Sequence, residues 1–243
     1  MRTAIRRVAL LGLLAVPASP LAAQAPLEGE VRQIVTFALL PGGTAEVVDL
    51  FRDRALPLYR ENEAMRSVRI FREVESPVPL DLVVVSSFEG MEVMDRSNAS
   101  LRSLAEDRGT SIRALYGEIA ARSRAHADEF VEMLPELGGG DPAAAALSVF
   151  IRYRVAPGTA EAFETAVVRI AAWEDDMEIP STTGRFLISD GWDYLRILGF
   201  DSLAEYHEYR QEERLVRGYD ALTLNTVRRQ EIVLSGMPDL QVR

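Results

Sequence analysis

The pattern of hydrophobic and polar positions runs through the same order of elements twice. Apolar residues at every second position indicate strands, and apolar residues three or four positions apart indicate helices. In one predicted helix, Val47, Phe51 and Ala55 share a stripe, and Pro57 should bend the last turn. The first half is predicted to contain a strand at 31–40, a helix at 44–59, strands at 68–74 and 82–88, a helix over about 91–125 and a strand near 129–133.

The second half repeats this order after a glycine-rich stretch. Residues 138–142 read Gly-Gly-Gly-Asp-Pro, a composition typical of a linker. The second half is predicted to contain a strand at 147–155, a helix at 160–173, strands at 184–189 and 194–200, a helix from 203 to about 227 and a strand at 231–234. The predicted domains are a first unit at 31–137, a linker at 138–146 and a second unit at 147–240.

The β-α-β-β-α-β order of each unit is that of the ferredoxin-like split-βαβ motif. Its sheet carries helices on one face only, so the other face needs a cover. Two copies in one chain predict that the two sheets pack against each other and close a barrel, with the helices outside. The expected fold class is therefore α+β, with two tandem ferredoxin-like units whose antiparallel sheets form an intramolecular α+β barrel.

The N-terminal residues predict export. Three arginines precede an apolar run at 8–16, and small residues follow as far as Ala25, which is the pattern of a signal peptide over 1–25. Cleavage after Ala23 or after Ala25 fits this pattern. The run is too short to cross a bilayer, and no later segment is apolar for long enough. We therefore expect a periplasmic or secreted protein with no membrane contact after cleavage.

The expected mature chain is acidic, which argues against nucleic acid as a partner. The chain has 27 basic and 37 acidic residues, and removal of the three arginines of the signal leaves a formal charge of −13. All the basic residues are arginine, so Schiff-base chemistry and a Walker-type phosphate loop are excluded. The absence of cysteine excludes thiol nucleophiles and disulfides, so the core must hold the fold.

Two segments, at 37–51 and 153–163, run from a strand through Pro-Gly into a helix, and residues 200–206 read Phe-Asp-Ser-Leu-Ala-Glu-Tyr. In these segments the chain resembles the dimeric α+β-barrel superfamily, and within it the NIPSNAP-like and antibiotic-biosynthesis-monooxygenase-like groups, as a tandem repeat. The resemblance implies one of three roles. These are cofactor-independent oxygenation of aromatic or quinone-like substrates, haem binding or breakdown, and small-molecule binding without known chemistry.

The chain has two histidines, His126 and His207. In haem-binding members of the superfamily a helical histidine can be the iron ligand, so the resemblance makes His207 the candidate axial ligand or general base. Its neighbours are those of a solvated helix face, which is the alternative interpretation. We expect His126 at a helix end, where a cation is favoured near the last carbonyl groups.

The second half carries arginine at four strand positions where the first half is uncharged. These arginines are Arg152, Arg154, Arg185 and Arg196. At least part of this set could converge on one face and form an anion or carboxylate site, which would make the second half the binding half. The alternative is that they pair with acidic residues or reach solvent. Side chains alternate between the two faces of a sheet along a strand. The spacing of the residues around Arg196 suggests that it points to the opposite face from Arg152 and Arg154, which favours this alternative.

Aromatic residues cluster around the same strands. They include Trp192, Tyr194 and Phe200, and aromatic residues at such positions usually belong to the core. If a pocket lies between sheet and helices, they should line it together with Tyr206 and Arg210. The acidic run at 174–178 lacks the alternating ligands of a calcium loop, so no metal site is expected.

Three functions remain open on the sequence. The first is an exported protein that binds a small organic molecule, with no assigned reaction and no cofactor apart from haem as a minor alternative. The second is a monooxygenase-like or haem-dependent oxidoreductase with its site in the second half. The third is a structural module that self-associates into a homo-oligomer through sheet edges. The sequence leaves enzyme status undecided.

Overall fold

The computed structural model describes residues 29–138, 140–142 and 145–242. The predicted signal peptide at 1–25 lies outside the described residues. The first half contains β1 (Val31–Leu39), α1 (Gly43–Leu50), the π-helical turn η1 (Phe51–Ala55), α2 (Leu56–Glu61), β2 (Ser67–Glu75), β3 (Leu82–Phe88), α3 (Met91–Asp107), α4 (Ile112–Ala120) and β4 (Ser123–Met133). The second half contains the 3-10 turn η2 (Pro135–Leu137), β5 (Leu147–Val155), α5 (Ala160–Asp176), β6 (Ser181–Ile188), β7 (Tyr194–Phe200), α6 (Leu203–Tyr209), α7 (Glu213–Leu224) and β8 (Thr226–Val242).

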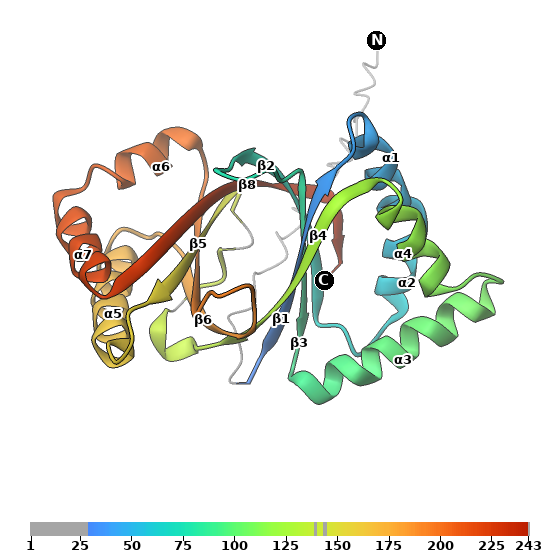
Figure 1. The fold of residues 1–243 in the computed structure, drawn as a ribbon, viewed down its shortest axis with the longest axis horizontal. Coiled ribbons are helices and arrows are strands. Elements are labelled where there is room, and N and C mark those ends of the chain that lie inside the picture. Colours follow the sequence, from blue (N-terminus) through green and yellow to red (C-terminus); the bar gives the residue numbers. More distant parts are fainter. Residues whose placement is uncertain (1–28, 139, 143–144, 243) are drawn as a thin grey trace, which may run out of the picture.

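The strands of the described chain form one closed barrel in the order β1-β3-β2-β8-β5-β7-β6-β4. Every neighbouring pair is antiparallel. Within each half the order is the same, β4-β1-β3-β2 and β8-β5-β7-β6, and the halves join through β2–β8 and β4–β6. Figure 1 shows the helices of the two halves on opposite outer sides of the barrel. The predicted fold class is therefore confirmed, and the edge strands of each half are hydrogen-bonded to those of the other.

The buried apolar side chains of the described residues form three clusters. One lies inside the barrel and draws on both halves, with Ile34, Phe71 and Phe150 among its members. The other two lie between the outer face of each half's sheet and its helices. Strand alternation explains this division, because Ile34 points inward while Val35, the next residue of β1, packs on the helices.

Charged side chains flank the inner apolar cluster along the barrel. Near the start of β1, Arg32 is buried beside Glu30. Further along the inner face, Arg152 of β5 pairs with Glu129 of β4. The barrel interior is thus a packed apolar centre with ion pairs toward its two ends, and it is no open channel.

The helical regions differ from the sequence prediction where single residues interrupt them. Ahead of Pro57 the helix widens into η1, and the Leu56 N–H donates to the carbonyl of Phe51, five residues back. The region predicted as one helix over 91–125 divides into α3 and α4 around Gly109, whose φ of +68° favours glycine. The helix predicted from 203 likewise divides into α6 and α7.

The prediction for His126 was wrong, because this residue lies on a strand. β4 begins at Ser123, and His126 pairs in register with Phe37 of β1. The segment around His126 carries little intrinsic preference for a strand, so pairing with β1 decides its conformation.

Candidate functional site

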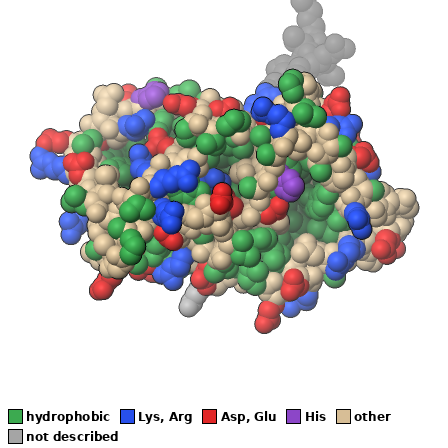
Figure 2. Space-filling view, in the orientation of Figure 1, with side chains coloured by type: hydrophobic (Ala, Val, Ile, Leu, Met, Phe, Trp, Pro, Cys, Tyr) green, Lys and Arg blue, Asp and Glu red, His purple; other side chains and the backbone are tan. Residues whose placement is uncertain are grey.

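A cavity of about 190 Å³ lies between the sheet and the helices of the first half. Strands β1, β3 and β4 provide one wall, and helices α2, α3 and α4 the other. In Figure 2 a hollow with hydrophobic side chains opens between β4 and this helix layer. The apolar lining includes Val35, Phe37, Phe51, Val84, Phe88 and Leu101. We call this cavity the first-half pocket.

Two tyrosines from different helices meet in the first-half pocket. The hydroxyl of Tyr59 on α2 lies 3.0 Å from the hydroxyl of Tyr116 on α4. Tyr59 is almost fully buried, and this burial, reinforced by Tyr116, raises its pKa well above the usual value. Tyr59 therefore stays a neutral phenol that can donate or accept a hydrogen bond inside an apolar cavity.

A histidine and a carboxylate stand on β4 at the mouth of the pocket. His126 stacks on Phe37 with 6.4 Å between the ring centroids, and its Nε2 lies 3.7 Å from Oδ2 of Asp128. Gln33 of β1 donates to Oδ1 of Asp128 over 3.0 Å. The His126 side chain is 54% exposed, so it contacts both solvent and the pocket. Its ring nitrogens can donate or accept a hydrogen bond with a bound molecule.

The second half has a related cavity of about 170 Å³ with different chemistry. Arg229 pairs with Tyr153 as His126 pairs with Phe37, and Glu231 pairs with Ile151 as Asp128 pairs with Val35. These register equivalences place a fixed cation and a glutamate where the first half has a histidine and an aspartate.

Polar groups in the second-half cavity bind one another. The hydroxyl of Tyr206 donates to Glu231, which also contacts Arg229 and lies 3.7 Å from Arg210. Burial, with a smaller contribution from Glu75, raises the pKa of Glu231 to about 7. Both carboxylate oxygens of Glu231 already have partners, so the second-half cavity offers a ligand fewer polar contacts than the first-half pocket.

The four predicted arginines do not converge on one site. Arg152 faces the barrel interior and lies 2.6 Å from Glu129 of the first half. Arg196 points to the helix layer, where it is fully buried 2.5 Å from Glu174 of α5. The other two lie apart from both, with Arg185 paired to Glu164 and Arg154 exposed. The alternative interpretation, in which these arginines pair with acidic residues or reach solvent, describes them.

The remaining predicted site residues also separate. The Tyr194 hydroxyl donates to Glu164 over 2.6 Å, and Trp192 packs under the guanidinium of Arg228. Two other predicted residues, Tyr206 and Arg210, line the second-half cavity. His207 is exposed on α6 and is not among the described residues that line it.

Sequence reasoning missed the groups that make the first-half pocket distinctive. Tyr59 and Tyr116 lie 57 positions apart, and no local pattern links them. The sequence did carry a signal for the pair His126 and Asp128. They are two positions apart, so their side chains share a face when the segment is a strand. The assignment of that segment to a helix hid it.

Comparison with known proteins shows the fold and nothing finer. No family model matches the chain, and no curated protein matches it. A candidate monooxygenase from Lactobacillus acidophilus has a TM-score of 0.63 and 11% identity over 88% of this chain and 96% of that one. An anthrone oxidase-like protein has a TM-score of 0.60 and 12% identity over 88% and 93%. A mutant chlorite dismutase from Candidatus Nitrospira defluvii, in complex with cyanide, has a TM-score of 0.55 and 11% identity over 88% and 92%.

These likenesses show that the chain shares the α+β-barrel fold of those proteins. They do not reach the finer NIPSNAP-like assignment. In the part of the chain that the structure describes, no helix combines the length and the apolar character needed to cross a membrane.

Proposed function

We propose that the first-half pocket binds a small, largely apolar organic molecule. The observation that carries this proposal is an apolar cavity with a few polar groups on its wall, the arrangement typical of small-molecule sites. An engineered apolar cavity of about 150 Å³ binds benzene, so about 190 Å³ accommodates a compact aromatic molecule.

The polar groups of the pocket favour a ligand that is uncharged and carries a hydroxyl or carbonyl group. No arginine is among the described lining residues, and Asp128 would repel an anion. The hydroxyls of Tyr59 and Tyr116 can bind one polar group of the ligand, and His126 can bind another at the mouth. Phenols and quinones combine a flat apolar ring with such groups.

Oxidation of the bound molecule is the second candidate function. It is favoured by the structural likeness to a candidate monooxygenase and to an anthrone oxidase-like protein. His126 is the lining group suited to take a proton from a bound phenol, which would make the ring more electron-rich toward dioxygen. In this version the predicted enzyme uses the first half, in contrast to the second half that the sequence indicated.

Haem, which the resemblance allows, does not fit the residues present. Neither helix–sheet cavity reaches the roughly 300 Å³ of a drug-sized site, and a porphyrin is larger still. A larger cavity of about 710 Å³, at the end of the barrel where β1 begins, has no histidine among its described lining residues. His207 is exposed and is not among the described residues that line the second-half cavity, and His126 stands at an exposed rim.

Export and self-association remain part of the proposal. Export rests on the signal-like residues 1–25, and mass spectrometry of the protein from the periplasm or medium of the producing cell would test it. A homo-oligomer is compatible with the superfamily, and light scattering would measure it.

Binding can be tested by calorimetric titration with 2-naphthol at pH 7. We expect binding that weakens in Ser86→Leu, which fills the pocket, and in Tyr59→Phe, which removes one hydroxyl. Tyr206→Phe alters the corresponding cavity of the second half and serves as the matched control. No heat with 2-naphthol or other small phenols, or equal loss in the control, would contradict the proposal. Oxygen uptake with the bound phenol would separate the enzyme from the binding protein.

A further inference from the structure

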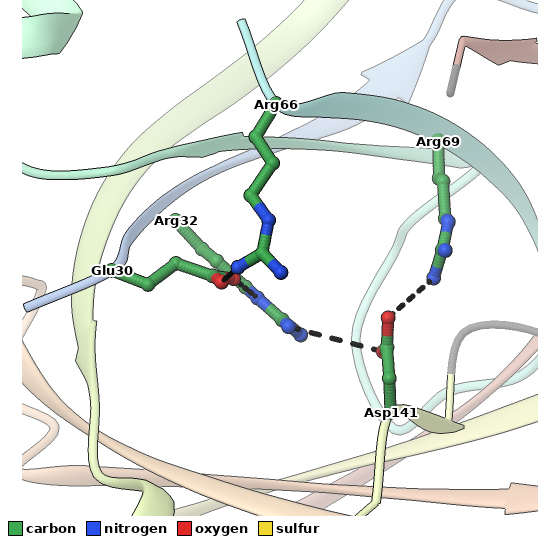
Figure 3. Close-up of polar contacts among 5 residues, drawn as sticks. All are labelled: Glu30, Arg32, Arg66, Arg69 and Asp141. Atoms are coloured by element: carbon green, nitrogen blue, oxygen red, sulfur yellow. Dashed lines mark hydrogen bonds and ion pairs between the residues drawn. The ribbon is translucent and has the colours of Figure 1, made fainter. Parts of the chain in front are cut away.

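Five charged side chains meet at the end of the barrel where β1 begins. Arg32 donates from Nε to Oε1 of Glu30 over 2.8 Å, and Arg66 also binds Glu30. Asp141, from the segment between the halves, lies between two guanidiniums: its Oδ1 is 3.8 Å from Arg32 Nη2 and its Oδ2 is 3.3 Å from Arg69 Nη1. Figure 3 shows Arg32 and Arg69 reaching Asp141 from two sides. Three cations and two anions leave this cluster with a formal charge of +1.

The distances from Asp141 to Arg32 and Arg69 are long for buried ion pairs. Charge-assisted hydrogen bonds between nitrogen and carboxylate oxygen are usually about 2.7–2.9 Å long, and both distances exceed this. The Arg32 side chain is only 5% exposed, so water does little to satisfy it. Arg69 also has a buried Nε with no hydrogen-bond partner among the described residues. Buried donors of this kind are costly unless an acceptor reaches them.

A cavity of about 710 Å³ adjoins the cluster. Its size is that of a site for a drug-sized molecule. Four arginines line it, Arg32, Arg66, Arg69 and Arg96, together with four acidic residues, Glu30, Glu63, Glu89 and Asp141, and apolar side chains that include Ala64 and Val93. A void of about 20 Å³ shares Arg32, Arg69 and Asp141 with it and is also lined by Ser148, whose Oγ is buried without a described partner. The site thus combines guanidinium donors, carboxylates and an apolar wall.

We propose that this end of the barrel binds an amphipathic organic anion. Its carboxylate or phosphate group sits between Arg32 and Arg69, whose guanidiniums lie 3.8 Å and 3.3 Å from the carboxylate of Asp141. Guanidinium groups bind planar or tetrahedral oxyanions through paired N–H donors, and the buried Nε of Arg69 is a donor without a described partner. The apolar body of the ligand lies along Ala64 and Val93.

This site differs from the first-half pocket in both place and chemistry. The two cavities share Met65 as a common wall, but no arginine is among the described lining of the first-half pocket. The anion site therefore stands whether or not phenols bind next door. It also lies in the half of the chain opposite to the arginines that the sequence singled out.

Titration with octanoate, octyl phosphate and octanol tests the proposal. We expect the two anions to bind the full chain and octanol to bind far more weakly. Arg69→Gln should weaken anion binding by about tenfold or more, since a hydrogen bond to a charged group is lost. Asp141→Asn should strengthen it several-fold, because the competing carboxylate is neutralised. Arg113→Gln, which removes an exposed charge on α4, is the matched control.

The opposite signs of the two variants protect the test from misfolding, since a damaged protein does not gain affinity. Comparison of octanoate with octyl phosphate identifies which oxyanion fits. Equal binding of octanol, unchanged affinity in Asp141→Asn, or an equal loss in Arg113→Gln would overturn the proposal.

Discussion

The buried ion pair between Arg196 and Glu174 gives the sharpest stability prediction. Both side chains are fully buried, with Arg196 Nη2 2.5 Å from Oε2 of Glu174. The other oxygen of Glu174 accepts a hydrogen bond of 2.6 Å from the Tyr209 hydroxyl. The pair therefore ties β7, α5 and α6 together inside the core of the second half.

Arg196→Met removes the cation and leaves the Glu174 carboxylate buried without its counter-ion. Breaking a buried pair in this way costs about 3–5 kcal/mol. For a chain of this size, 1 kcal/mol shifts the midpoint by about 2–4 °C, so we expect the thermal midpoint to fall by roughly 6–20 °C. The double variant with Glu174→Leu should recover much of this loss, because no charge stays buried and the Tyr209 hydroxyl still lies 2.7 Å from that of Tyr219.

Urea unfolding followed by circular dichroism measures the four corners of this double-mutant cycle. Arg217→Met breaks an exposed pair with Glu213 and should change stability far less. A small effect of Arg196→Met together with a changed affinity for an anion would refute the structural role, and would restore the prediction that Arg196 binds a ligand.

Three further predictions concern single residues. The pKa of Glu231 is raised to about 7 in the folded protein, so Glu231 stabilises the fold fully at pH values below its pKa in the unfolded chain. The free energy of unfolding should then fall by up to about 3 kcal/mol as pH rises through about 7, and Glu231→Gln should remove this pH dependence. A Cβ at Gly184 would lie 2.4 Å from a Val131 methyl, so Gly184→Ala should lower the free energy of unfolding by about 1–3 kcal/mol where β4 meets β6. Gly117→Ala, in open space on α4, should raise it by about 0.5–1 kcal/mol, and urea unfolding measures both changes. Titration with haemin should give no Soret shift that depends on His207, and a shift abolished by His207→Ala would show that haem binds there despite the small cavities.

The local order of elements was predictable because it depends on neighbours in the sequence. Hydrophobic period identified the strand–helix order of both halves, and the Pro-Gly turns marked where helices begin. The predicted ends of helices and strands were wrong where long-range pairing overrides local preference. His126 is an example, because it pairs with Phe37 across 89 positions. The cover needed by each sheet's bare face was also foreseeable, since an apolar face exposed to water is unstable.

The chain by itself therefore determined the class of fold and the sharing of one barrel by two similar halves. Only the tertiary structure decided which side chains meet. The four arginines that a strand overlay grouped together separate: three of them pair with Glu129, Glu164 and Glu174, and Arg154 is exposed. Arg32 and Arg69 instead converge with Asp141. The physical reason is that pockets and ion pairs depend on register and on the space left between packed elements, and neither quantity is encoded in a local pattern.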